Sequence, residues 1–63
     1  MEGFEVILTI QDPKTKKVGV LRNQFCGERC IERALAVSQT EIESWVVRDK
    51  MVLLSLIIVP VTL

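Results

Sequence analysis

Two cysteines are the residues of this chain best suited to covalent or metal chemistry, and they lie four positions apart, at Cys26 and Cys30. On a helix this spacing places both thiols on neighbouring turns of one face. There they would form a redox pair, or half of a metal site shared with a second copy. The same spacing suits small apolar side chains on a buried helix face, and C-x-x-x-C lacks the C-x-x-C spacing of redox motifs. Packing is the favoured interpretation, and a thiol-dependent role is the weaker hypothesis.

The sequence lacks the residues on which most enzymes depend. It contains no histidine, which is the commonest general base and the commonest metal ligand. It also has no glycine-rich phosphate loop, nucleophile elbow or metal-binding motif. We therefore predict a non-enzymatic protein that uses no cofactor and no metal.

Basic side chains offer a second kind of chemistry, the binding of phosphate or other anions. Arg29 and Arg33 are one helical turn apart and would hold successive phosphates. However, Arg29 is also spaced to pair with Glu32, and the net charge of the chain is +0, which disfavours a dedicated nucleic-acid binder. A dimeric regulator that binds nucleic acid is kept as the alternative hypothesis, with contacts from Lys14, Lys16, Lys17, Arg22, Arg29 and Arg33.

Trp45 is the only tryptophan of the chain. It would stack on a base or insert into a partner, but a single tryptophan in a small domain is more typical of a core. Glu41 and Glu43 alternate on one face if their segment is a strand. Without a cleft beside them they predict no acid–base catalysis.

The stretch from Met51 to Leu63 carries no charge, and its only polar side chains are Ser55 and Thr62. Such a run must be buried on both faces, in a core, against a partner or in lipid. It is shorter than the roughly 20 residues that cross a bilayer as a helix, and its valines and isoleucines favour a strand. We predict no membrane span.

The first half of the chain predicts a hairpin followed by a helix. Residues 4–10 alternate as a strand, and residues 17–21 return as a second strand after a charged turn around Pro13. Residues 26–38 form an amphipathic helix with Gly27 on its inner face. The helix is expected to be capped at Asn23 or Gln24.

The second half allows two interpretations. Ser38 and Glu41 fit the S-x-x-E capping box that would open a second helix. The β-branched residues that follow favour two strands instead, at about residues 41–47 and 51–59. We favour the strands. The predicted order is then β-β-α-β-β, a single α+β domain over residues 1–63 with one helix on an antiparallel or mixed sheet, in two layers.

A chain of 63 residues, 49% of them hydrophobic, is too small to bury so much apolar surface by itself. We therefore predict a homo-oligomer that completes the sandwich, with another protein as the alternative partner. Two cysteines and no signal peptide indicate the cytoplasm. The expected interface is the apolar segment Met51, Val52, Leu53, Leu54, Leu56, Ile57, Ile58 and Val59.

Overall fold

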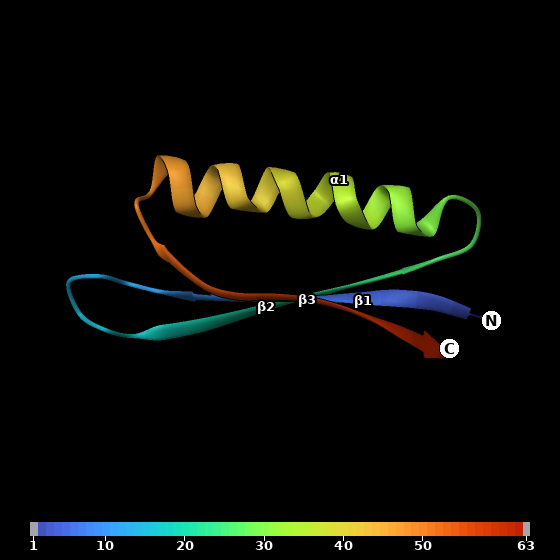
Figure 1. Cartoon of the computed structure of the whole chain (residues 1–63), viewed down its shortest axis with the longest axis horizontal. Helices are drawn as coiled ribbons and strands as arrows, with labels where there is room; N and C mark the ends of the chain where they lie inside the picture. Colours follow the sequence, from blue (N-terminus) through green and yellow to red (C-terminus); the bar gives the residue numbers. More distant parts are fainter. Residues whose placement is uncertain (1, 63) are drawn as a thin grey trace.

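The structure is a computed structural model and describes residues 2–62. Its elements follow in the order β1 (Glu2–Gln11), β2 (Val18–Cys26), α1 (Cys30–Ile42), η1 (Glu43–Arg48) and β3 (Val52–Thr62). The π-helical segment η1 continues α1 without a break, and Figure 1 shows this one long helix lying along one face of the sheet. The chain is thus a small α+β domain with a layer of helix on a layer of sheet.

The three strands form an antiparallel sheet in the order β2-β1-β3. The turn between β1 and β2 is fixed by Asp12, whose carboxylate accepts hydrogen bonds from the backbone N–H groups of Lys14 at 2.8 Å and Thr15 at 3.3 Å. A carboxylate that bonds the backbone beyond it in this way is a common turn device. The predicted hairpin is confirmed, although both of its strands are longer than predicted.

The predicted start of the helix is wrong. Asn23 and Gln24, the expected caps, lie inside β2, where they pair with Val6 and Glu5 of β1. The chain leaves β2 through Gly27, whose φ of 89° is in the left-handed region that favours glycine. The helix begins at Cys30 without a side-chain cap, because strand pairing with β1 outweighs the local capping signal.

The predicted strand over residues 41–47 is also wrong, since the helix runs through it to Arg48. The Ser38 hydroxyl donates to the Ala34 carbonyl at 2.7 Å and therefore opens no new helix. One turn further on, the Trp45 indole N–H donates to the Glu41 carboxylate at 2.7 Å, a contact that helical spacing provides. The order is β-β-α-β with three strands, not β-β-α-β-β. The predicted last strand is confirmed as β3.

The core is small and comes mainly from one face of β1. Val6, Leu8 and Ile10 are at most 3% exposed, and they face the helix, where Ala34 is fully buried. The helix packs on β1 and β2. The opposite side of the sheet, here called the open face, has no covering layer within residues 2–62 (Figure 1). By strand alternation its central members are Glu5, Ile7, Thr9, Val20, Arg22, Gln24, Ser55, Ile57 and Val59.

Gly3 is expected to be essential for the close approach of β1 and β2. A Cβ at this position would overlap the Phe25 carbonyl oxygen, whereas a Cβ at Gly19 would lie 3.7 Å from Ile10 Cγ1, an ordinary contact. Gly3→Ala should therefore lower the free energy of unfolding by roughly 1–3 kcal/mol. Gly19→Ala, the control, should change it by less than about 1 kcal/mol. Urea unfolding of both variants measures the difference, and equal stabilities would contradict the close approach.

Candidate interaction surface

Both outer strands of the sheet, β2 and β3, have an edge without a partner strand within residues 2–62, and the edge of β3 is the longer and the more apolar of the two. β3 is the last strand in the sheet order, and within residues 2–62 no other strand pairs with its outer side. An edge strand presents a row of unpaired backbone N–H and C=O groups, which is a template for another strand. Proteins protect such edges with charged side chains, with proline, with β-bulges or with a covering element. β3 spans 11 residues and has a proline, Pro60, and a bulge at Leu54, but it has no charged side chain.

The hydrogen bonds of the hairpin show which backbone groups of β3 point outward. The Asp12 N–H donates to the Lys17 carbonyl, so even-numbered residues of β1 direct their backbone groups to β2 and odd-numbered ones to β3. The β3 residues opposite Val6 and Leu8 are Ile58 and Leu56. Their backbone groups therefore point away from β1, into the free edge.

Pro60 fits this pattern and limits the free edge. It lies opposite Phe4, so it also belongs to the outward-facing set and its missing N–H breaks no bond to β1. A second strand could not receive a hydrogen bond from it. The usable edge is therefore the part of β3 before Pro60.

The predicted interface residues all lie on this edge strand or just before it. Leu56 is 37% exposed and Ile57 is 46% exposed, although they point to opposite faces. A β-bulge at Leu54 lies between Leu53, which pairs with Ile10, and Ser55, which pairs with Thr9. Of the eight predicted residues, the exposed ones are Val52, Leu53, Leu54, Leu56 and Ile57, and the half-buried ones are Met51, Ile58 and Val59.

A polar cluster around Glu5 occupies the open face beside β3. Arg22 Nη1 lies 2.9 Å from Glu5 Oε1, and Gln24 Nε2 donates to Glu5 Oε2 at 3.1 Å. The Gln24 hydrogen bond and then the Arg22 guanidinium hold the pKa of Glu5 below its ordinary value. The sequence analysis missed this cluster, because Gln24 was assigned to the helix start and not to a strand opposite Glu5.

The six predicted anion-binding residues are not brought together. Arg22 pairs with Glu5, Arg29 Nε lies 3.0 Å from Glu32 Oε2, and Arg33 donates to the Cys26 carbonyl. These three arginines are engaged within the chain. The three lysines lie at or beside the β1–β2 turn, away from them.

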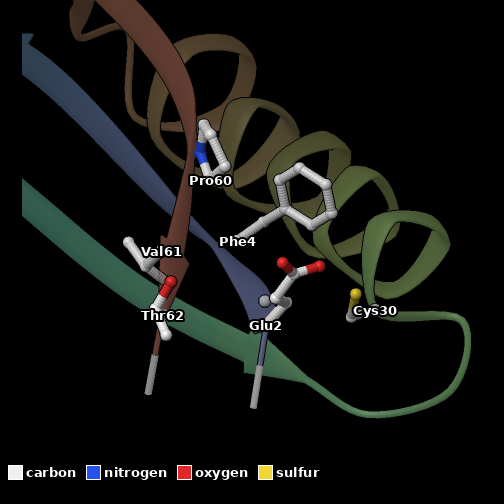
Figure 2. A pocket seen from close by; sticks show the side chains of 7 residues that line it. Glu2, Phe4, Cys30, Pro60, Val61 and Thr62 are labelled. Atoms are coloured by element: carbon white, nitrogen blue, oxygen red, sulfur yellow. The ribbon is translucent and has the colours of Figure 1, made fainter.

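The two cysteines do not share a helix face as predicted. Cys26 ends β2 and, by alternation with Gln24, belongs to the open face. Cys30 lines a hollow of about 520 Å³ on the helix side, together with Phe4 and Pro60 (Figure 2). Both thiols are free. Among residues 2–62, no three His, Cys, Asp or Glu side chains gather where they could hold a metal ion.

Trp45 and the two predicted carboxylates lie on the helix, not on a strand. Trp45 is half-buried and bonded to Glu41, whereas Glu43 is exposed. Within the described residues, no helix is both long enough and apolar enough to cross a membrane. No known protein family matches this chain, and no curated protein or solved structure is significantly similar to it.

The Glu5 cluster predicts how stability depends on pH. The folded-state pKa of Glu5 lies below its ordinary value, so its contribution is present above about pH 4.3. That contribution is lost as the pH falls through the lower, folded-state pKa. Urea unfolding between neutral and acidic pH should show a smaller acid-induced loss of stability for Glu5→Gln than for the wild type. Glu43→Gln, which removes an exposed carboxylate, is the control. An unchanged pH profile for Glu5→Gln would contradict the prediction.

Proposed function

We propose that this protein is a non-enzymatic assembly module that associates with a second copy of itself by pairing β3 with β3. The observation that supports this is the free edge of β3, which is uncharged and has apolar side chains on both faces. Pairing would satisfy its outward N–H and C=O groups and cover apolar surface in the same step.

The solvent-exposed area of the single chain is larger than that expected for a compact monomer, which supports association with a partner. The chain exposes 4507 Å², whereas a compact monomer of the same mass is expected to expose about 4,100 Å². β3 contributes to this exposed area: the helix packs on β1 and β2, and Leu56 at the β3 edge is 37% exposed. A second copy supplies an identical uncharged edge, so the pairing buries no unpaired charge on either side.

The outward backbone groups define the register of the pair. Two copies related by a two-fold axis through Ile57 would run antiparallel, with Leu56 of each copy bonding Ile58 of the other. In this register Pro60 of each copy lies opposite the bulged Leu54 of the other, so the new hydrogen bonds are those between Leu56 and Ile58. Both helices would then lie on the same face of a sheet of six strands, and the Ile57 side chains would meet on the open face.

The proposal includes a cytoplasmic location, which the free thiols of Cys26 and Cys30 support. Binding of a different protein at the same edge would use the same backbone groups. A second copy is preferred because its β3 is equally uncharged and apolar, so two β3 strands can pair without burying a charge.

The test removes one outward N–H from each edge of the sheet. Ile58→Pro removes an outward N–H of β3, and Val20→Pro removes an outward N–H of β2, which lies opposite Thr9. Neither change breaks a bond to β1. Light scattering over a concentration series should show self-association for the wild type and Val20→Pro, and a monomer for Ile58→Pro.

Circular dichroism should show that both proline variants fold. A wild type that stays monomeric at every concentration would refute the proposal, and so would a folded Ile58→Pro variant that associates as the wild type does.

A further inference from the structure

The chain is neutral in total, but the fold distributes its charge unevenly. Figure 1 shows the β1–β2 turn and the end of the helix at the same end of the molecule, opposite both termini. This end, here called the basic end, holds five cations against two carboxylates, Asp12 and Asp49. All five cations are exposed, and they are Lys14, Lys16, Lys17, Arg48 and Lys50.

The positive charge of the basic end is not compensated by ion pairs. The salt bridges within residues 2–62 belong to Arg22 and Arg29, which lie outside the basic end. The Asp12 carboxylate is bonded to the backbone of its own turn. The five cations therefore remain available to an external anion.

Exposed aliphatic side chains adjoin these cations. Val18 follows Lys17 directly and is 56% exposed, and Val47 precedes Arg48 and is 62% exposed. A nucleic-acid site would be expected to add aromatic side chains on which bases stack. The nearest tryptophan, Trp45, is half-buried and bonded to Glu41. Cations flanked by exposed aliphatic residues are instead typical of proteins that bind at a membrane surface.

We propose that the basic end binds the surface of an anionic lipid bilayer. The lysines and Arg48 contact headgroup phosphates and carboxylates, while Val18 and Val47 reach the boundary of the acyl chains. The contact is peripheral and end-on, with both termini directed away from the bilayer (Figure 1). It does not depend on the pairing of β3, so the two proposals can fail independently.

Vesicle sedimentation of the full chain tests this proposal. The protein should sediment with vesicles of phosphatidylcholine and phosphatidylserine, remain in the supernatant with phosphatidylcholine alone, and be released by salt. Lys17→Gln should weaken binding about fivefold, and the triple change of Lys14, Lys16 and Lys17 to Gln on the order of 100-fold. Arg29→Gln removes one exposed charge outside the basic end, and it should change binding less than about twofold.

Three outcomes would overturn the proposal. The first is no binding to vesicles that contain phosphatidylserine, and the second is equal loss of binding for Lys17→Gln and Arg29→Gln. The third is binding to generic RNA or DNA without binding to vesicles, which would assign the basic end to nucleic acid. Val18→Ser should weaken binding to vesicles that contain phosphatidylserine, because Val18 reaches the boundary of the acyl chains. Unchanged binding of this variant would overturn the insertion of Val18.

Discussion

The whole structure depends on β1, because among the strands of residues 2–62 it is the one with a partner on each side. Its even-numbered residues bond β2 and its odd-numbered residues bond β3, while one of its faces supplies Val6, Leu8 and Ile10 to the core. A core built from three side chains of one strand and a few small residues of a helix is thin for a domain of this size. The remaining apolar residues stay near the surface.

The exposed edge of β3 follows from this arrangement. A single helix cannot cover three strands, and here it packs on β1 and β2. Alternate residues of β3 bond β1 through their backbone groups. The N–H and C=O groups of the residues between them point outward and remain free for a partner. The fold therefore concentrates unsatisfied backbone groups and apolar side chains in one strand. The charged groups lie outside β3, most of them in the Glu5 cluster, on the helix and at the basic end.

The sequence predicted the elements whose signals are local and regular. The alternation of residues 4–10 and the uncharged run after Met51 were sufficient for β1 and β3. The helix start could not be predicted, because Asn23 and Gln24 pair with β1 only through contacts distant in sequence. Residues 41–47 give conflicting signals, because their β-branched side chains favour a strand while their apolar spacing fits a helix. The helix forms because this segment packs in the fold and because Trp45 bonds Glu41 one turn away. Of the site, the apolar edge was predictable, whereas the grouping of Arg48 and Lys50 with the turn lysines required the fold.

Amide hydrogen exchange of the wild-type protein tests the central claim most directly. The outward N–H groups of Leu56 and Ile58 on β3 can be compared with those of Val20 and Arg22 on the β2 edge, which also point away from β1. If β3 pairs with β3 of a second copy, the Leu56 and Ile58 amides exchange slowly and their protection rises with protein concentration. The Val20 and Arg22 amides stay fast. Equally fast exchange at all four positions, at every concentration, would contradict the account.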